Sequence, residues 1–144
     1  MKTVKQILKD KEGSVLAIQP DATVFDALKL MAEKNVGALL VLEAGRLTGI
    51  LSERDYARKV ILKGKSSLNT PVRDIMTERV RFVHPEQTVE ECMALMTDKH
   101  VRHLPVLVGD QVVGVVSIGD LLKASIDEKD FVIKQLENYI TGGR

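Results

Sequence analysis

Two short motifs place a serine three residues before an aspartate, each where an apolar run ends and a helix can begin. They read Gly49-Ile50-Leu51-Ser52-Glu53-Arg54-Asp55 and Gly114-Val115-Val116-Ser117-Ile118-Gly119-Asp120. Free backbone N–H groups and the positive end of the helix dipole favour a phosphate at such a point. The serine could donate a hydroxyl to that phosphate, and the aspartate could accept from a ribose diol. Ser-x-x-Asp is equally an ordinary capping box, and for one copy that structural interpretation is favoured by about two to one.

A second candidate group is Arg102-His103, which precedes Leu104-Pro105-Val106. The planar guanidinium of Arg102 could pair with a phosphate, and His103 could add a donor or stack on a base. A surface ion pair and a solvated histidine explain the same residues equally well. The residues 65 positions earlier are Gly37 and Ala38, which carry no charge. Two sites built on these segments therefore cannot be chemically equivalent.

Other chemistry has little support in the sequence. The three histidines (His84, His100 and His103) and Cys92 fit no closed tetrahedral spacing, so the chance of a metal site is roughly one in twenty. The chain contains no Gly-x-Ser-x-Gly elbow, no Walker loop and no paired carboxylates beyond the capping positions. We therefore expect no metal, no catalytic residue and no enzymatic activity.

The two Ser-x-x-Asp motifs belong to a longer internal repeat. Residues 15–59 align without gaps on residues 80–124, and 14 of these 45 positions are identical. Chance would give about three for average composition. A weaker similarity precedes each copy, between residues 4–8 and 72–76. The unit is therefore about 60 residues long, and two copies are expected to pack together because one alone buries little surface.

Each copy predicts the element order β-α-β-β-α. Thr23 and Thr88 are N-cap candidates, each with an acidic residue three positions later. In the first copy, the predicted elements are an apolar strand at 15–18, a helix from Thr23, strands at 38–42 and 47–51, and a helix over 53–62. In the second copy, they are a strand at 80–83, a helix from Thr88, strands at 104–108 and 112–116, and a helix over 119–125. Cys92 falls on the apolar face of its helix.

Domain boundaries follow from the repeat. Repeat 1 is expected to span residues 1–65 with an N-terminal lead helix, and repeat 2 residues 66–126. The polar segment 63–71 should connect them. Residues 127–144 predict a separate amphipathic helix and a tail, and this helix could cover the pair or a partner chain.

Composition narrows the functional classes. The 144 residues include 21 Lys and Arg against 20 Asp and Glu, and aromatic residues make up 3% with no tryptophan. A near-neutral chain with few aromatics is a poor candidate for binding nucleic acid. One cysteine excludes an internal disulfide framework. No apolar run is long enough for a bilayer and no secretory signal is visible, so we expect a cytoplasmic protein without a membrane partner.

At this point the residues resemble a known family. The duplicated unit, the Gly-x-x-Ser-x-x-Asp motif closing each copy, the Arg102-His103-Leu104-Pro105-Val106 run and the Asp74-Ile75-Met76-Thr77 segment are similar to a tandem pair of CBS (cystathionine β-synthase) domains, also called a Bateman module. The resemblance covers residues 3–126 or so. It extends to a subgroup of stand-alone bacterial CBS-pair proteins and their plant organellar relatives.

The resemblance implies an α+β fold in which two β-α-β-β-α repeats pack with pseudo-twofold symmetry, with a C-terminal helix added. It also implies two clefts for adenosine ligands, a homodimer and a regulated partner protein. NAD or AMP is the first choice of ligand, with ATP or ADP next and S-adenosylmethionine within the family's range. The resemblance assigns ribose to the aspartates, phosphate to the serines and to Arg102 with His103, and adenine to Met76 and Thr77. The full set of implied site residues is Gly37, Ala38, Ser52, Arg54, Asp55, Met76, Thr77, Arg102, His103, Pro105, Ser117 and Asp120.

In this family the Arg-His pair of one repeat commonly reaches the ligand held by the other repeat. Arg102 and His103 would then serve the ligand on Asp55, while Gly37 and Ala38 would line the site of Asp120. The leading hypothesis is a non-catalytic adenine-nucleotide sensor that acts through a partner. The alternative is a structural homodimerisation module with vestigial pockets.

Overall fold

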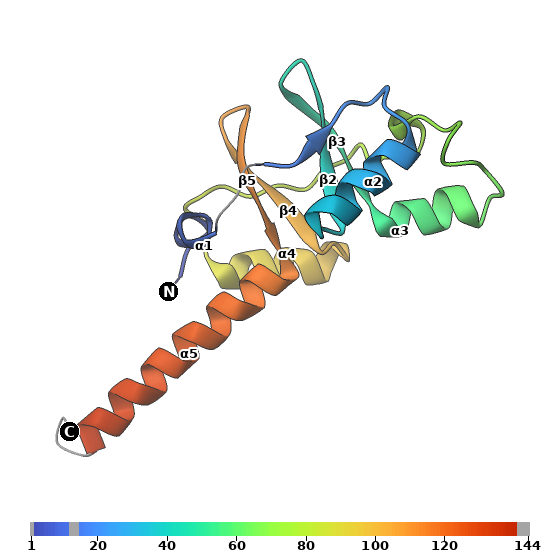
Figure 1. The fold of residues 1–144 in the computed structure, drawn as a ribbon. Coiled ribbons are helices and arrows are strands. Elements are labelled where there is room, and N and C mark those ends of the chain that lie inside the picture. Colours follow the sequence, from blue (N-terminus) through green and yellow to red (C-terminus); the bar gives the residue numbers. More distant parts are fainter. Residues whose placement is uncertain (1, 12–14, 141–144) are drawn as a thin grey trace. The chain divides into compact units, whose positions relative to one another are not determined.

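The computed structural model describes residues 2–11 and 15–140, and the chain divides into two compact units. Unit 1 comprises Met1–Gly13, Val83–Val106 and Gly114–Arg144. Unit 2 comprises Ser14–Phe82 and Leu107–Val113. Each unit therefore combines segments that are far apart in the sequence (Figure 1).

Unit 2 is a three-stranded sheet with helices. Strand β2 lies between β1, which is parallel to it, and β3, which is antiparallel. The elements are β1 (Ala17–Ile18), α2 (Val24–Lys34), β2 (Ala38–Glu43), β3 (Arg46–Ser52), α3 (Glu53–Tyr56), a π-helical turn η1 (Ala57–Ile61) and a 3₁₀ turn η2 (Val72–Asp74). Its core consists of Val24, Ala27, Met31, Leu39, Val41, Leu51, Val60, Val72 and Ile75.

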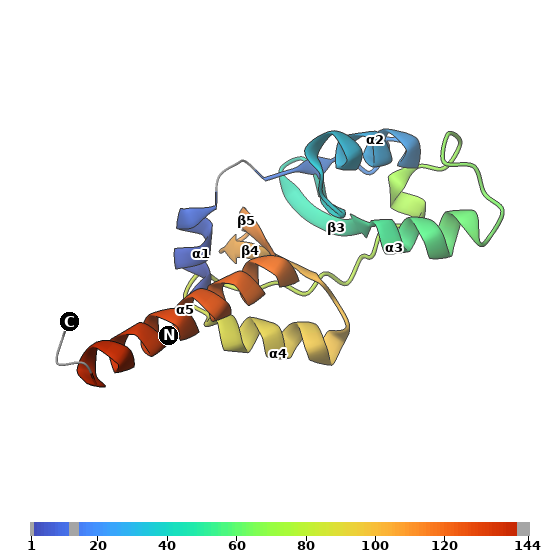
Figure 2. The same cartoon turned by 60° about the horizontal axis from the view of Figure 1, so that its bottom comes forward.

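Unit 1 combines a two-stranded sheet with three helices. Figures 1 and 2 agree that α4 lies beside the first turns of α5. The elements are α1 (Val4–Asp10), α4 (Val89–Lys99), β4 (His103–Val108), β5 (Gln111–Ser117) and α5 (Ile118–Ile140), except that the end of the β4–β5 hairpin, Leu107–Val113, belongs to unit 2. Its core consists of Val4, Ile7, Val83, Val89, Cys92, Met96, Leu104, Val106, Val116, Leu121 and Ala124.

The predicted helix starts are confirmed at both copies. Thr23 is the N-cap of α2 and Thr88 is the N-cap of α4, and each hydroxyl accepts from a backbone N–H three residues later. Both helices end on a residue in the left-handed conformation, Asn35 (φ 53°) and His100 (φ 56°). These two residues are again 65 positions apart, so the repeat extends to the helix ends.

The first strand of each copy differs, and a proline explains the difference. In unit 2, β1 pairs with β2, and the N–H of Leu40 donates to the carbonyl of Leu16 at 3.2 Å. The residue 65 positions later is Pro105, which has no N–H to donate. The predicted strand at 80–83 is therefore reduced to one parallel bridge between Val83 and Val106. The hydrogen bond from Val83 N–H to the Pro105 carbonyl, at 3.0 Å, remains.

The prediction of two separate C-terminal helices was wrong. Residues 118–140 form the single 23-residue helix α5, because no residue between the two expected helices interrupts the backbone hydrogen bonds of the helix. Glycine and proline are both absent from residues 120–141. Residues 141–144 of the predicted tail lie outside the described residues. The boundaries drawn at residues 65 and 126 remain predictions.

The lead segment of each repeat packs within the unit that contains the other repeat's motif. Helix α1 belongs by sequence to repeat 1, but Leu8 lies against Gly114 of unit 1. Met76 belongs by sequence to repeat 2, but it lies against Gly49 of unit 2. A Cβ added at Gly49 would lie 2.7 Å from the Met76 Sδ, and one at Gly114 would lie 2.6 Å from a Leu8 methyl carbon. Both glycines therefore make room for a lead segment.

Candidate functional site

The first candidate site lies where β3 of unit 2 passes into α3. The Ser52 N–H donates to Asp55 Oδ2 at 3.0 Å, and the Ser52 hydroxyl lies 3.1 Å from the same oxygen. The Asp55 N–H donates in return to Ser52 Oγ at 3.2 Å. The two residues thus form a complete capping box at the start of the helix. The motif therefore does form an ordinary capping box. The cap uses the same Ser52 and Asp55 oxygens that a ligand would contact.

The other carboxylate oxygen of Asp55 is also occupied. Asp55 Oδ1 accepts from the Thr77 hydroxyl at 3.3 Å and lies 3.1 Å from the Lys59 ammonium. Lys59 also donates to the carbonyl of Ile75 at 2.9 Å. Thr77 is held in place by two backbone hydrogen bonds with Ile50, at 2.9 and 3.0 Å. The structure therefore brings Thr77, Ser52 and Asp55 together, as three of the predicted site residues.

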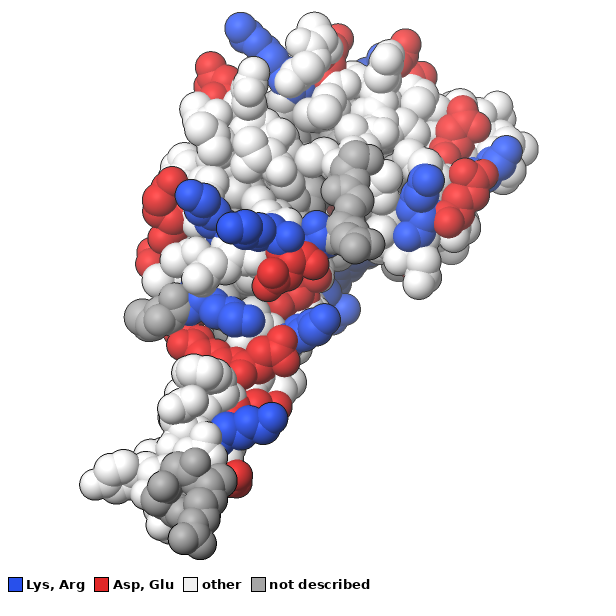
Figure 3. All heavy atoms as spheres, turned by 60° about the vertical axis from the view of Figure 1, so that its left-hand side comes forward, with Lys and Arg blue, Asp and Glu red and all other residues white. Residues whose placement is uncertain are grey.

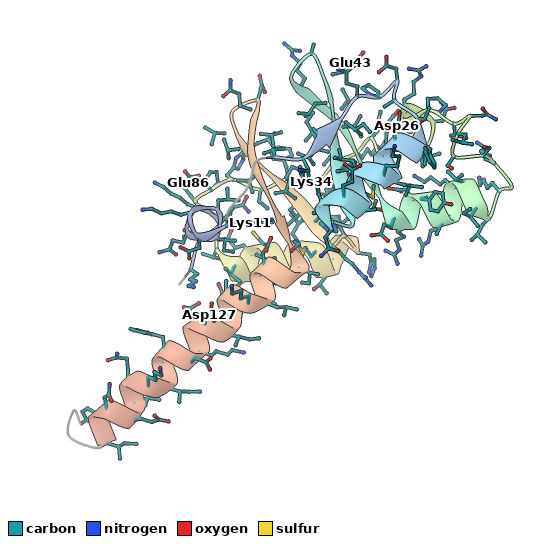
Figure 4. All side chains as sticks on the ribbon, viewed as in Figure 1. Lys11, Asp26, Lys34, Glu43, Glu86 and Asp127 are labelled. Carbon is teal, nitrogen blue, oxygen red and sulfur yellow. The ribbon has the colours of Figure 1, made fainter. Side chains whose placement is uncertain are left out.

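The second candidate site lies where β5 of unit 1 passes into α5. The Ser117 N–H donates to Asp120 Oδ2 at 2.8 Å, and the Asp120 N–H donates to Ser117 Oγ at 3.1 Å. The Lys11 ammonium lies 2.9 Å from Asp120 Oδ2 and donates to the Val115 carbonyl at 2.9 Å. Figure 4 labels Lys11, which follows α1. Each aspartate thus combines a capping box with one lysine.

Asp120 is held in its charged form. Burial alone would raise the pKa of its carboxyl, but the hydrogen bonds from Ser117 and Lys11 and the charge of Lys11 outweigh burial. The pKa of Asp120 is therefore lowered from its ordinary value. A carboxylate that stays charged near neutral pH can accept two hydrogen bonds from a diol, provided that Lys11 leaves room for it.

The residues before β2 and β4 lie at the same two helix starts. The carbonyl of Gly37 accepts from the Glu53 N–H at 3.0 Å in unit 2. The carbonyl of Arg102 accepts from the Ile118 N–H at 2.9 Å in unit 1. Within each unit, the predicted Gly37 and Arg102 segments are therefore next to their own serine motif.

The remaining predicted residues are placed as follows. Met76 lies against Gly49, next to Thr77, so it belongs to the Asp55 cluster. Ala38 is paired with Ser52 across β2 and β3. Arg54 lies in the first turn of α3, and His103 and Pro105 lie in β4. Asp55 and the Arg102-His103 pair belong to different units, and their joint use of one ligand stays a prediction.

Sequence reasoning did not place either lysine against its aspartate, although Lys59 belongs to a basic stretch with Lys63 and Lys65 that could hold a phosphate. Lys59 follows Asp55 by four residues, a spacing that indicates a helical ion pair and could have been recognised. Lys11 is 109 residues from Asp120, and no short spacing in the sequence predicts that contact. Both lysines also bind a backbone carbonyl, so they fix the cluster as well as neutralise it.

Cys92 lies fully buried in the core of unit 1, as the helix pattern predicted. Burial, together with the nearby charge of Glu91, raises the pKa of its thiol to about 11. A thiol of this kind stays protonated and is a poor nucleophile or metal ligand near neutral pH. Across residues 2–11 and 15–140, no three His, Cys, Asp or Glu side chains gather into a group that could hold a metal ion.

Comparison with known proteins gives a consistent result. The family model for the CBS domain matches residues 4–62 and 72–127. A mitochondrial CBS domain-containing protein of Arabidopsis thaliana, CBSX3, is 44% identical over 150 residues, covering 98% of this chain and 73% of the relative. A solved CBS-domain protein from Burkholderia ambifaria is 51% identical, with a TM-score of 0.84 over 88% of this chain and 95% of the other. The solved CBS domain NE2398 is 50% identical, with a TM-score of 0.83 over 87% and 98%.

In the part of the chain that the structure describes, no helix combines the length and the apolar character needed to cross a membrane. The longest, α5, carries charged side chains along its length, as Figure 4 shows at Asp127.

Proposed function

The chain belongs to the CBS-domain family, and from that premise we propose that it is a non-catalytic regulatory module that binds an adenine nucleotide and acts through a partner protein. NAD or AMP is the proposed ligand of first choice, with ATP or ADP next. Binding would have to favour one conformation over another, because a ligand shifts an equilibrium only by its difference in affinity for the two states.

One observation carries this proposal. The same polar cluster is built twice, at a strand-to-helix junction in each unit, from a serine, an aspartate and a lysine. A capping box by itself needs only a hydroxyl side chain and an acidic one, as Thr88 and Glu91 at the start of α4 illustrate. The added lysines supply positive charge at both junctions, which suits a phosphate-bearing ligand.

Roles are proposed residue by residue. Asp55 and Asp120 would accept from ribose hydroxyls, and Ser52 and Ser117 would donate to phosphate. Met76 and Thr77, which already contact the Asp55 cluster, would lie against an adenine. The list of further proposed contacts is Gly37, Ala38, Arg54, Arg102, His103 and Pro105.

A structural neighbour supports the class of ligand. The CBS domain pair of protein MJ0100 was solved with 5′-methylthioadenosine and S-adenosyl-L-methionine, both adenosine compounds. It shares the fold, with a TM-score of 0.78, at 24% sequence identity.

A second candidate function is a structural assembly module with vestigial pockets. It is favoured by the capping boxes, since both aspartates already accept hydrogen bonds from the backbone N–H of their own serine. The apolar surface of α5 points the same way, because Leu136, Tyr139 and Ile140 are largely exposed.

The deciding experiment is a thermal-shift panel with AMP, ADP, ATP, NAD, NADH and S-adenosylmethionine. A ligand at a hundred times its Kd should stabilise the protein by about 2.7 kcal/mol, which is a shift of several degrees. Asp55→Ala should abolish or strongly reduce the shift. The matched control is Glu91→Ala, which removes the same kind of capping box at the start of α4.

The outcomes separate the two functions. A selective shift that is lost in Asp55→Ala and kept in Glu91→Ala supports a nucleotide sensor and names its signal. The absence of any shift at millimolar ligand rejects the sensor and favours the assembly module. If Asp55→Ala binds like the parent and only melts lower, Asp55 is a helix cap.

A further inference from the structure

Beyond its first turn, α5 exposes a continuous apolar stripe. Its members alternate at spacings of four and three residues, and they are Leu122, Ile126, Lys129, Ile133, Leu136 and Ile140. This is the a/d pattern of a heptad repeat, with isoleucine at every a position, leucine at two d positions and a lysine at the third. The five apolar members are between 45% and 81% exposed. We call these six residues the α5 seam.

The opposite face of α5 is the one that packs within unit 1. Leu121 and Ala124 are buried in the unit 1 core. Further along, the residues that line a shallow pocket between α1 and α5 are Lys2, Gln6, Asp127, Glu128 and Phe131. Because each residue of a helix turns by about 100°, the seam lies on the other side from these residues. The seam is therefore not required by the core of its own unit.

The seam has a helix that is already formed. The part of α5 beyond the core, residues 126–140, would be marginal as an isolated helix in water, since the first turn is costly to nucleate. Here the first turns of α5 are anchored through Leu121 and Ala124, and the helix continues to Ile140 without a break. Figure 3 shows uncharged surface along one side of the distal part of α5, next to a row of charged side chains.

We propose that the α5 seam forms an antiparallel two-helix coiled coil with the same helix of a second copy of this chain. Val132 and Tyr139 flank the seam and are 50% and 86% exposed. With them, exposed apolar side chains extend along one side of α5 from Leu122 to Ile140, which gives a second copy of the helix an apolar surface along its length.

The charges choose the antiparallel orientation. A parallel, in-register pair would place Lys129 against the partner's Lys129 inside an apolar layer, which like charges disfavour. An antiparallel pair aligned with Ile126 opposite the partner's Leu136 instead places Lys129 opposite the partner's Ile133. That alignment also brings Lys123 beside the partner's Glu137 at both ends of the seam. Asp130 then meets its own copy near the twofold axis, flanked by the two Lys129 ammonium groups.

The first test measures association of the full-length protein by sedimentation equilibrium. Leu136→Asp should weaken the dimer on the order of a hundredfold, because each aspartate would face the apolar Ile126 of the other copy and be buried without a partner. Gln135→Asp is the matched control, since it adds an aspartate in the same turn but outside the seam. Far-ultraviolet circular dichroism checks that both variants keep the fold. A monomeric parent, or equal association of Leu136→Asp and parent, overturns the proposal.

The second test fixes the orientation by disulfide trapping. The double variant Ile126→Cys with Leu136→Cys should crosslink into a covalent dimer, and Ile126→Cys alone should not. The native Cys92 does not compete, because it is fully buried. Crosslinking of Ile126→Cys alone would indicate a parallel pair, and no crosslink in either protein would reject the seam. Both outcomes are independent of nucleotide binding.

A third variant isolates the role of Lys129. Lys129→Leu completes the apolar seam, so it should tighten the dimer by roughly tenfold and allow a parallel pair as well. The crosslink of Ile126→Cys alone should then appear in the Lys129→Leu background. If Lys129→Leu weakens association, Lys129 makes a favourable contact in the dimer and the charge argument is wrong.

Discussion

The two serine-aspartate clusters share their caps but obtain their lysines in opposite ways. Around Asp55, the lysine comes from the same helical segment, four residues away. Around Asp120, it comes from Lys11, which follows α1 at the other end of the chain. A duplicated motif therefore reproduces the short-range hydrogen bonds of a site, while its charge balance is supplied separately for each copy.

The clusters differ in a second respect. The residue before β4 is Arg102, and the residue in the same position before β2 is Gly37. Both carbonyls accept a hydrogen bond from the first N–H of the following helix, so the backbone is alike and the side chain is not. We expect two sites of related shape and unequal affinity for phosphate.

The largest expected effect separates the two aspartates. If Arg102 serves the ligand on Asp55, as the family resemblance implies, the Asp55 site is the tighter of the two. In calorimetric titrations with the ligand chosen by the thermal panel, Asp55→Ala should then lose at least about a hundredfold in affinity at that site, which corresponds to about 2.7 kcal/mol. Asp120→Ala should remove the weaker site and leave the tighter one within a few-fold of the parent. Equal losses in the two variants would show that the sites are equivalent, against the difference at Gly37 and Arg102.

Next in size is the effect of filling the space at the two glycines. Gly49→Ala should destabilise the protein by about 2 kcal/mol, since its Cβ would meet both the Met76 sulfur and, at 3.0 Å, the backbone oxygen of Thr77. Gly114→Ala should cost about 1 kcal/mol, because only the flexible end of Leu8 has to move. Urea unfolding measures both, and a larger loss for Gly114→Ala would contradict the ranking.

A smaller effect concerns phosphate contacts. Arg102→Ala should weaken ATP by about 1.5 kcal/mol, roughly tenfold, and adenosine hardly at all, because a guanidinium pairs with phosphate rather than with the nucleoside. Titrations with adenosine, AMP and ATP test the trend. Losses of the same size for all three ligands would assign Arg102 a purely structural role.

The smallest effect tests the ion pair at Asp120. Because the pKa of Asp120 is lowered in the folded state, its contribution to stability is present above its ordinary pKa and is lost as the pH falls through the folded value. Lys11→Met should therefore cost about 0.5 kcal/mol at pH 7, and the difference should shrink toward zero as the pH falls through the lowered pKa of Asp120 and the carboxyl becomes protonated.

Urea unfolding across this pH range measures the difference, with Lys9→Met as the control from the exposed side of α1. A Lys11→Met penalty that is the same at both ends of the range would mean that the lysine acts through packing and its hydrogen bond to Val115 rather than through charge.

Much of the fold was predictable because its signals are local. The caps at Thr23 and Thr88, the two hairpins and the repeat itself follow from short spacings in the sequence. The continuity of α5 was also within reach, since no residue from 120 to 141 is a helix breaker. The loss of the strand at 80–83 follows from Pro105 once the pairing partner is known.

The site was only partly predictable, because its remaining contacts are long-range. The Ser-x-x-Asp spacing in the sequence was enough to identify Ser52, Asp55, Ser117 and Asp120 as candidates. Lys11 reaches Asp120 only after the chain has folded, and its own neighbours in sequence give no hint of that contact. The titrations described above test which part of a ligand each of these residues contacts.

The exchange of lead segments has a consequence for how the chain is made. Helix α1 leaves the ribosome before the rest of unit 1, but Val4 and Ile7 pack in a core that also needs Leu121 and Ala124. During synthesis this helix must wait for more than a hundred further residues before its apolar face is covered. Contacts of such long sequence separation slow folding and leave apolar surface exposed in the meantime. The charged side chains of Lys5, Lys9 and Asp10 would keep α1 soluble until its apolar face is covered. Unit 2 can form its own core in the meantime.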